Sequence, residues 1–321
     1  IIGWDDQKCR SRKPVVHFQQ GPGMPAESSR SFWPQLEESI SRATSQPFVI
    51  ENTTSASGGC INSACVVSGG GKEYFVKTNR ADLLDMFEAE GEALSVMSQS
   101  RTVRVPRPVN WGKVDDTAWL AMEYIKLGGS GSQALLGEQL AAMHRSSADR
   151  FGWHRDNTIG STPQHNRWHD NWIEFFRDQR LAYQLSLARR HGHHGSLQRN
   201  GERLLEVIED FFPAYQPLPS MLHGDLWGGN YSTDESGQPV IYDPAFYYGD
   251  READIAMTEL FGGFGQDFHD AYNAAWPLDS GYAVRRTLYN LYHVINHLNL
   301  FGGGYGMQAE NMINQLLSLR N

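Results

Sequence analysis

The sequence predicts an α+β fold of two lobes: a smaller β-rich lobe over residues 31–124 and a larger helical lobe over 125–321. Short apolar stretches separated by glycines fill residues 48–124, which is typical of strands joined by tight turns. Beyond residue 134, apolar side chains recur mainly at helical spacing. A Gly/Ser run at 128–132 lies between these regions and marks the expected lobe boundary.

Composition and charge limit the classes of protein that fit. The chain of 321 residues has 40% hydrophobic and 20% charged residues and a formal net charge of −9. This acidic balance argues against a general affinity for nucleic acid or anionic membranes. No apolar run approaches the roughly 20 residues that cross a bilayer. The start of the sequence carries charges where a signal peptide is apolar, so we expect a cytoplasmic protein.

The first 30 residues are polar, rich in Pro, Gly and Ser, and without periodicity, and they predict a flexible extension in which Met24 is a candidate native start. The three cysteines, Cys9, Cys60 and Cys65, are too few and too unevenly spaced for a disulfide framework. We therefore expect no disulfide framework and a fold that begins near residue 32.

The predicted β-rich lobe contains candidate phosphate-binding residues. A strand–turn–strand pattern carries Gly58 and Gly59 in its turn, where backbone amides can approach phosphates closely. Glycines in hairpin turns are also ordinary turn chemistry, so this signal is weak alone. Lys77 ends the apolar stretch 73–77, which predicts a packed stem and an ammonium group held in one direction.

A helix over residues 83–97 follows this lysine, and it carries Glu88, Glu90 and Glu92. A strand lysine paired with a helix glutamate and reaching the α- and β-phosphates is the arrangement found in kinases. We expect Glu90, four residues before the inward-facing Leu94, to be the partner of Lys77. The other two glutamates are predicted to be surface charges.

The strand 119–124 ends at the predicted lobe boundary. Backbone groups of Met122, Glu123 and Tyr124 are placed to bind an adenine edge, although an ordinary interdomain linker has the same pattern. The rest of the chain is predicted to be mainly helical. Helices are expected at 134–148, 168–190, 196–212, 251–261, 267–275, 284–300 and 307–319.

The segment Leu-His-Gly-Asp-Leu-Trp-Gly-Gly-Asn at 222–230 holds the strongest chemical signal. Asp225 is followed by Asn230 and, after a predicted hairpin, by Asp243. A carboxylate in this position can accept the proton of an alcohol that attacks a γ-phosphate. Amide and carboxylate oxygens suit Mg²⁺, so Asn230 and Asp243 are the predicted metal ligands. An isolated turn with Asx capping is the plain alternative, but it does not account for the upstream lysine.

Several longer segments resemble one family. They are LHGDLWGGN, YDPAFYYGDREADIAM, YNLYHVINHLNLFGGGY, FGWHRDNTIGSTPQHNRW and NWIEFFRDQRL. Together they are similar to the fructosamine-3-kinase, or ketosamine-3-kinase, family from about residue 32 to 319. The resemblance implies the aminoglycoside-phosphotransferase-like relative of the protein kinase fold. It also implies that MgATP phosphorylates the O3 hydroxyl of ketosamines, which leads to protein deglycation.

The resemblance assigns roles residue by residue. It matches Asp225 to the proton acceptor, Asn230 and Asp243 to the metal ligands, and Lys77 with Glu90 to the phosphate-binding ion pair. The hinge falls at 122–124. Trp227 stands where a protein kinase carries a basic residue, and the Asp-Phe-Gly and Ala-Pro-Glu motifs are absent from the sequence. These departures argue against a protein kinase regulated by loop phosphorylation.

Four further residues are candidates for contact with the sugar: His223, Trp227, Asn296 and His297. An aromatic face such as that of Trp227 suits the C–H surface of a sugar, while local packing explains each of them equally well. Cys60, in the glycine-rich turn, is a candidate for oxidation or for a disulfide-linked dimer of an otherwise monomeric protein.

Two other functions stay open from the sequence. A related phosphotransferase for an aminoglycoside, a choline-like compound or another amino-alcohol would share the same nucleotide site. A pseudokinase that only binds nucleotide is a different class, and the presence of all four expected residues, Lys77, Asp225, Asn230 and Asp243, speaks against it.

Overall fold

The computed structural model describes residues 28–56 and 62–319, and the chain divides into two compact units. Unit 1 takes in the chain up to Glu88 together with Pro108–Tyr124. Unit 2 takes in Ala89–Arg107 and the chain from Ile125 onward. The candidate residues Gly58, Gly59 and Cys60 lie outside the described residues, as do residues 1–27 of the predicted extension.

Unit 1 is built on a five-stranded antiparallel sheet of order β1-β2-β3-β5-β4. The strands are β1 Asn52–Ala56, β2 Ser63–Gly69, β3 Lys72–Arg80, β4 Pro108–Val114 and β5 Thr117–Glu123. The predicted end of β3 at Lys77 is wrong, because this strand continues to Arg80. Lys77 lies inside the sheet, opposite Ala64 on one side and Leu120 on the other.

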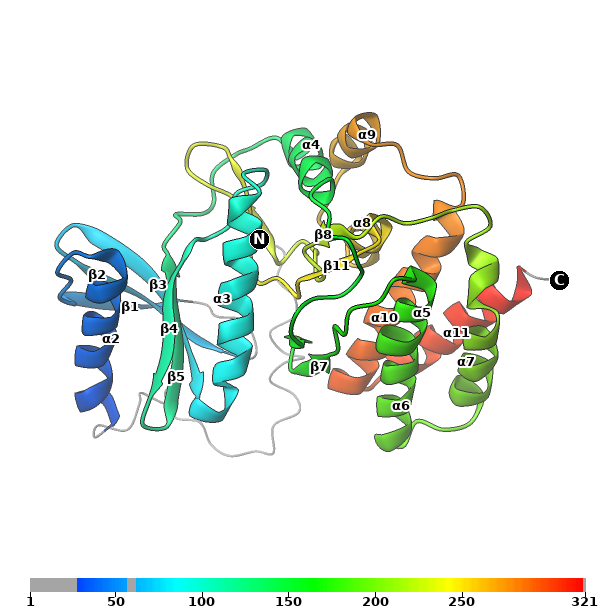
Figure 1. Cartoon of the computed structure of the whole chain (residues 1–321), viewed down its shortest axis with the longest axis horizontal. Coiled ribbons are helices and arrows are strands. Elements are labelled where there is room, and N and C mark those ends of the chain that lie inside the picture. The colour runs from blue at the N-terminus through cyan, green and yellow to red at the C-terminus, as the bar shows by residue number, and fades with distance from the viewer. Residues whose placement is uncertain (1–27, 57–61, 320–321) are drawn as a thin grey trace. The chain divides into compact units, whose positions relative to one another are not determined.

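Helix α2, Ser28–Thr44, packs on this sheet (Figure 1). Its residues Phe32, Leu36 and Ile40 recur at helical spacing and are almost fully buried against the sheet residues Val67 and Val76. Burying large apolar side chains in this way is worth roughly 1.5–3 kcal/mol each. The apolar stripe of α2 therefore supplies much of the core of unit 1.

A single 3₁₀ turn, Ala81–Leu83, leads into α3, Leu84–Gln99. The predicted helix at 83–97 is thus confirmed within two residues. Buried Phe87, Leu94 and Met97 form its inward face. The helix passes from unit 1 to unit 2 between Glu88 and Ala89.

Unit 2 is mainly helical, as predicted. Figure 1 shows α5, α6, α7, α10 and α11 gathered together in this unit. The helices are α4 Gln133–His144, α5 Trp172–Phe176, α6 Tyr183–Arg190, α7 Ser196–Glu206, α8 Arg251–Leu260, α9 Gln266–Ala275, α10 Tyr282–Phe301 and α11 Tyr305–Ser318.

Three helix boundaries differ from the prediction by four residues or more. The helix expected to run to residue 148 ends at His144. The helix expected from residue 168 begins at Trp172, because the Asn171 side chain accepts hydrogen bonds from the N–H groups of Ile173 and Glu174. A π-helical segment, Arg177–Ala182, then joins α5 to α6. The helix expected at 196–212 ends at Glu206, and a short 3₁₀ helix follows over Ile208–Phe211.

Three pairs of short strands complete unit 2. The predicted hairpin after residue 230 is confirmed as β9 Tyr231–Thr233 and β10 Pro239–Ile241. The strand β8 Ser220–Leu222 pairs antiparallel with β11 Tyr247–Gly249. A further hairpin consists of β6 Asn157–Ile159 and β7 Thr162–Gln164.

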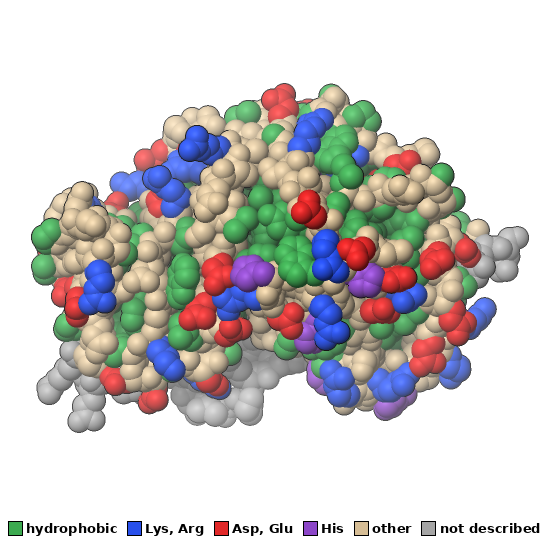
Figure 2. All heavy atoms as spheres, viewed as in Figure 1, with side chains coloured by type: hydrophobic (Ala, Val, Ile, Leu, Met, Phe, Trp, Pro, Cys, Tyr) green, Lys and Arg blue, Asp and Glu red, His purple; other side chains and the backbone are tan. Residues whose placement is uncertain are grey.

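Charged side chains of both signs are interspersed on the face drawn in Figure 2. This view therefore shows no large single-signed patch of the kind that binds polyanions. Within the described residues, no helix is long and apolar enough to span a membrane.

Candidate active site

The candidate active site of unit 2 is a loop between two strand pairs. Strand β8 leads into residues 223–230, and the β9–β10 hairpin returns the chain to the same place. The backbone N–H of Tyr242 donates to the carbonyl of Asn230 at 3.1 Å. Asp243 follows directly, so the hairpin brings the second predicted metal ligand next to the first.

Asp225 lies at the centre of this loop with partial solvent exposure. The Asn230 side-chain nitrogen donates to the Asp225 carbonyl at 2.9 Å and lies 3.4 Å from its carboxylate Oδ2. Burial, together with the negative charges of Asp243 and Asp254, raises the pKa of Asp225 to about 7. A carboxylate with this pKa can take up a proton near neutral pH, as a general base must.

The backbone around Asp225 requires glycine at residue 224. Gly224 has φ +82°, a conformation that L-residues rarely adopt. A Cβ atom there would lie 2.0 Å from the carbonyl oxygen of Ala245. The close approach joins the two segments that carry Asp225 and Asp243. Asp243 itself has φ +59°, an uncommon conformation for a non-glycine residue that is often found at functional sites.

Asp254 on α8 holds the backbone of the loop. Its carboxylate accepts hydrogen bonds from the N–H groups of His223 at 2.7 Å and Gly224 at 2.8 Å. His144 of α4 lies 3.1 Å from the same carboxylate and 2.8 Å from the Tyr272 hydroxyl. These bonds outweigh burial and lower the pKa of Asp254. His144 could not be recognised from the sequence, since a single histidine at the end of an apolar helix usually only packs.

His223 is fully buried. Its Nε2 lies 2.9 Å from the Tyr242 carbonyl, and its Nδ1 accepts a long hydrogen bond from the Asp225 N–H at 3.3 Å. Both ring nitrogens are thus engaged within the loop. This geometry favours a positioning role, and its predicted contact with a sugar stays a prediction.

The other three predicted substrate residues lie in different surroundings. The Trp227 ring packs over Gly229, where a Cβ would come within 2.1 Å of it. Asn296 is 2% exposed and accepts a hydrogen bond from Gln184. His297 is half-buried among the rings of the cluster Phe261, Phe301 and Tyr305. The structure does not test their contact with substrate.

Amide side chains from the β6–β7 hairpin hold the segment after Asp243. Asn157 Nδ2 donates to the Phe246 carbonyl at 2.8 Å, and Gln164 Nε2 donates to the Ala245 carbonyl at 3.0 Å. Gln164 also accepts from the Tyr292 hydroxyl at 2.8 Å. These residues could not be recognised from the sequence, because a polar loop residue leaves no periodic pattern.

The candidate nucleotide-binding residues lie on β3, on or directly after β5, and on α3. Lys77 is only 4% exposed on β3, and Met122 is buried on β5 with Glu123 at the end of that strand. Tyr124 is the last residue of unit 1. Glu90 lies half-buried on the part of α3 that belongs to unit 2, so its pairing with Lys77 stays a prediction.

The donor set near Asp225 fits a hard divalent cation. Asn230 uses its side-chain nitrogen on the Asp225 carbonyl, which leaves the amide oxygen for another partner. Asp243 adds a carboxylate whose charge already raises the pKa of Asp225. Oxygen donors of this kind suit Mg²⁺. Among the residues that the structure describes, no group of three or more His, Cys, Asp or Glu side chains is arranged to hold a metal ion.

Known proteins with similar sequences belong to one family. A cyanobacterial protein from Synechocystis sp., named as a probable ketoamine kinase, is 44% identical over 290 residues, covering 89% of this chain and 97% of its own. The chloroplastic protein-ribulosamine 3-kinase of Arabidopsis thaliana is 44% identical over 269 residues, covering 83% of this chain and 82% of its own.

Solved structures agree on the fold. A crystal structure from Haemophilus somnus, assigned as a fructosamine-3-kinase, superposes with a TM-score of 0.83 at 26% identity, covering 91% of this chain and 99% of its own. An ADP-bound aminoglycoside phosphotransferase gives a TM-score of 0.59 at 14% identity, covering 92% and 97%, and shares the fold alone. The profile of the fructosamine kinase family matches residues 32–319. The chain belongs to the fructosamine kinase family.

Proposed function

We propose that this protein phosphorylates the O3 hydroxyl of ketosamines, such as ribulosamine or fructosamine, free or linked to protein, with MgATP as the phosphate donor. The observation that carries the proposal is the Asp225 carboxylate, which has a pKa of about 7 and lies beside Asn230 and Asp243. The relatives named as ketoamine and ribulosamine kinases support the substrate class.

In this proposal, Asp225 orients the O3 hydroxyl and accepts its proton as the oxygen attacks the γ-phosphate. Asn230 and Asp243 would hold Mg²⁺, which neutralises charge on the phosphates when it is bound. Lys77 with Glu90 would bind the α- and β-phosphates, and the backbone of 122–124 would contact adenine. His223 would keep Asp225 in place through its hydrogen bond to the loop backbone.

The substitution Asp225→Asn tests the proposed base. We expect kcat to fall by about 10²–10⁴-fold, because proton transfer by a positioned group contributes that much. Binding of MgATP should change little. Calorimetry of ATP binding beside a phosphate-transfer assay on ribulosamine separates the two effects, and Asp149→Asn, on a loop outside the site, serves as the matched control. Full activity in Asp225→Asn would remove this residue as the base.

The same pair of measurements tests the pseudokinase alternative. A protein that only binds nucleotide would bind ATP and transfer no phosphate to any acceptor, whether or not Asp225 is present. We expect instead that the unsubstituted chain shows turnover.

The phosphorylated ketosamine would be an unstable adduct. Its breakdown after release would make the reaction a step in protein deglycation. The cytoplasmic location stays a prediction, and the plant relative is named as chloroplastic. Oxidation or dimerisation through Cys60 stays a prediction, since that residue lies outside the described part of the chain.

A further inference from the structure

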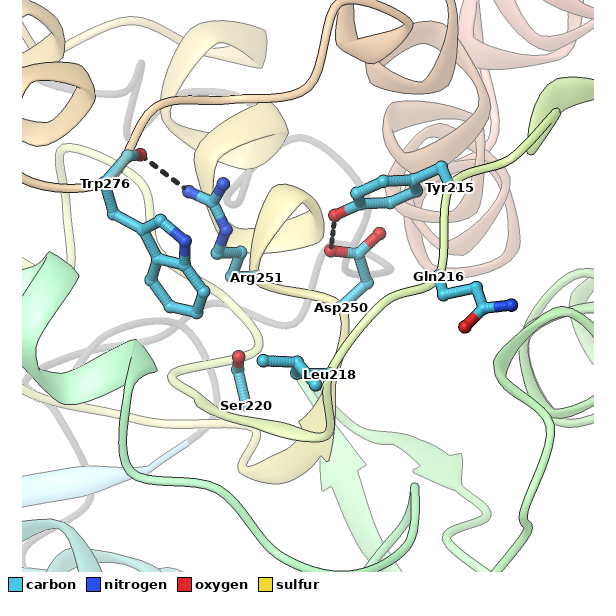
Figure 3. A pocket seen from close by; sticks show the side chains of 7 residues that line it. All are labelled: Tyr215, Gln216, Leu218, Ser220, Asp250, Arg251 and Trp276. Atoms are coloured by element: carbon cyan, nitrogen blue, oxygen red, sulfur yellow. Dashed lines mark hydrogen bonds between the residues drawn. The ribbon is translucent and has the colours of Figure 1, made fainter.

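A cavity of about 190 Å³ lies in unit 2 (Figure 3). Its walls come from the loop before β8, the junction of β11 with α8, and the end of α9. The lining residues are Tyr215, Gln216, Leu218, Ser220, Asp250, Arg251 and Trp276. None of them has a role in the chemistry proposed above, so this cavity needs its own explanation.

Arg251 gives the cavity a fixed positive charge. The side chain is 6% exposed and donates to three neutral acceptors: the Tyr272 hydroxyl and the carbonyls of Trp276 and Pro277. Within residues 28–56 and 62–319, no carboxylate forms an ion pair with its guanidinium. The guanidinium also stacks over the Trp276 ring, 4.1 Å from its centroid, and the negative charge of Glu252 is close enough to interact with it. A buried cation without a direct ion pair remains costly. An anionic ligand would offset that cost.

Hydrogen-bond donors at the cavity suit a carboxylate. A guanidinium has five N–H donors, and the three bonds of Arg251 leave two, one of which is Nε–H. Ser220 is 1% exposed, and its hydroxyl has no hydrogen-bond partner although it is buried. Figure 3 shows this hydroxyl turned toward the space between Trp276, Arg251 and Leu218. Two guanidinium donors and one hydroxyl match the two oxygens of a carboxylate.

Asp250 limits the charge that the cavity accepts. One of its oxygens accepts from the Tyr215 hydroxyl at 2.9 Å and the Glu252 N–H at 3.0 Å, and the other accepts from the Tyr289 hydroxyl. The carboxylate is therefore satisfied by protein donors, while its nearby charge opposes a dianion such as phosphate. A single negative charge fits better.

The size and remaining walls define the body of the ligand. The volume is below the roughly 300–1,000 Å³ of most ligand pockets, so a nucleotide is too large. Leu218, which is 58% exposed, and Trp276 supply apolar surface. We propose that this cavity binds a small organic monocarboxylate with an apolar or aromatic body the size of benzoate, and that its occupation tightens the catalytic loop.

Strand β8 and helix α8 connect the cavity to the catalytic loop at residues 223–230. Ser220 begins β8, which runs directly into His223 and Asp225, and it pairs with Gly249 of β11. Arg251 begins α8, whose Asp254 holds the backbone of the same loop. A ligand that bridges Ser220 and Arg251 contacts the first residues of both supporting elements. Any stabilisation that it gives the loop is reciprocal, because coupling between two sites acts equally in both directions.

Saturation-transfer NMR with benzoate as the probe tests the site on the full chain and needs no turnover. We expect binding in the millimolar range or tighter, as is usual for a ligand of this size, with no comparable binding of neutral benzamide or cationic benzylamine. Inorganic phosphate, added as a competitor, should not displace benzoate. The variant Leu218→Trp, which fills the opening from an exposed position, should abolish binding. Met307→Trp, at an exposed position of α11, is the matched control and should retain it. Ser220→Ala should weaken binding severalfold.

Hydrogen exchange with and without benzoate then tests the coupling. Backbone amides of residues 221–226 should exchange severalfold more slowly when benzoate is bound, and this slowing should disappear in Leu218→Trp. Equal binding of benzamide, or benzoate binding that Leu218→Trp and Ser220→Ala leave unchanged, would overturn the site. Binding at the site without any slowing at 221–226 would overturn the coupling. Because both readouts omit ATP and ketosamine, their failure is distinct from failure of the proposed kinase activity.

Discussion

Gly224 shows how one residue fixes the geometry of the candidate active site. Its substitution by alanine adds a Cβ only 2.0 Å from the Ala245 carbonyl, in a backbone conformation with φ +82°. We expect Gly224→Ala to lower the free energy of unfolding by about 2–4 kcal/mol, from backbone strain plus the clash. Urea denaturation measures this change.

Gly192→Ala is the matched control for that substitution. Gly192 has φ +90°, but a Cβ there would meet nothing within 4 Å. It should therefore show the backbone strain alone, about 1–2 kcal/mol. An equal loss in both variants would mean that the contact with Ala245 is unimportant.

The buried His293 on α10 should make the free energy of unfolding depend on pH. Burial lowers the pKa of this histidine to about 3, with a smaller effect from His297. The unfolded chain has the ordinary value of about 6.5, so it binds more protons as the pH falls and the folded state loses stability. Between pH 7.5 and 5.5, this residue alone lowers the free energy of unfolding by about 1.4 kcal/mol.

The variant His293→Gln should lose that part of the acid destabilisation. Urea unfolding of both proteins at pH 7.5, 6.5 and 5.5 measures it. Relative to the unsubstituted protein, the free energy of unfolding of the variant should rise by about 1.4 kcal/mol from pH 7.5 to 5.5. His194→Gln, on an exposed loop where the ring is solvated in both states, is the control. Parallel pH curves for His293→Gln and the unsubstituted protein would contradict the account.

Among the elements, the β6–β7 hairpin supports the segment that carries Asp243. Gln164 is 1% exposed and bonds to Asn157, Tyr292 and the Ala245 carbonyl. Gln164→Met keeps the size and removes these bonds, leaving buried polar partners unsatisfied. We expect it to cost about 2–4 kcal/mol of stability and to lower kcat severalfold.

A second buried glutamine separates the loss of activity from the loss of stability. Gln198 is 6% exposed and donates to the carbonyls of Leu185 and His193, which are not part of the candidate site. Gln198→Met should also destabilise the protein but leave kcat unchanged at a temperature where both variants are folded. Equal kcat in the two variants would show that the hairpin does not position the Asp243 segment.

Much of this arrangement could be predicted from the sequence where the signal is local. The glycine-separated apolar stretches predict the sheet of unit 1, and two short strand-like stretches around a turn at 233–238 predict the β9–β10 hairpin. The support of the site could not be predicted in the same way. His144 and Asp254 meet across 110 residues, and Gln164 meets Ala245 across 81. Such contacts depend on tertiary packing and leave no periodic pattern in the sequence.

The ends of helices and strands also depend on contacts that the sequence pattern does not reveal. The start of α5 depends on the Asn171 side chain as a cap, and the earlier tryptophan at residue 168 only continues an aromatic pattern. The extension of β3 beyond Lys77 depends on pairing with β5, where Thr78 lies opposite Trp119. Polar residues such as Thr and Asn give a weak strand signal alone, and the neighbouring strand decides their conformation.

For the molecule as a whole, membership of the fructosamine kinase family and the geometry around Asp225 lead to one central claim: the protein transfers phosphate from MgATP to O3 of a ketosamine. The family match covers residues 32–319, so it includes both units. The substrate and the position of phosphorylation belong to the proposal.

The most direct test is phosphorus–proton correlation NMR of the product formed from MgATP and ribulosyl-lysine or fructosyl-lysine, with an aminoglycoside assayed in parallel. We expect a phosphate on O3 of the ketosamine, a rate of product formation that is about 10²–10⁴-fold lower in Asp225→Asn, and no comparable turnover of the aminoglycoside. Phosphate on another hydroxyl, or transfer to the aminoglycoside alone, would contradict it.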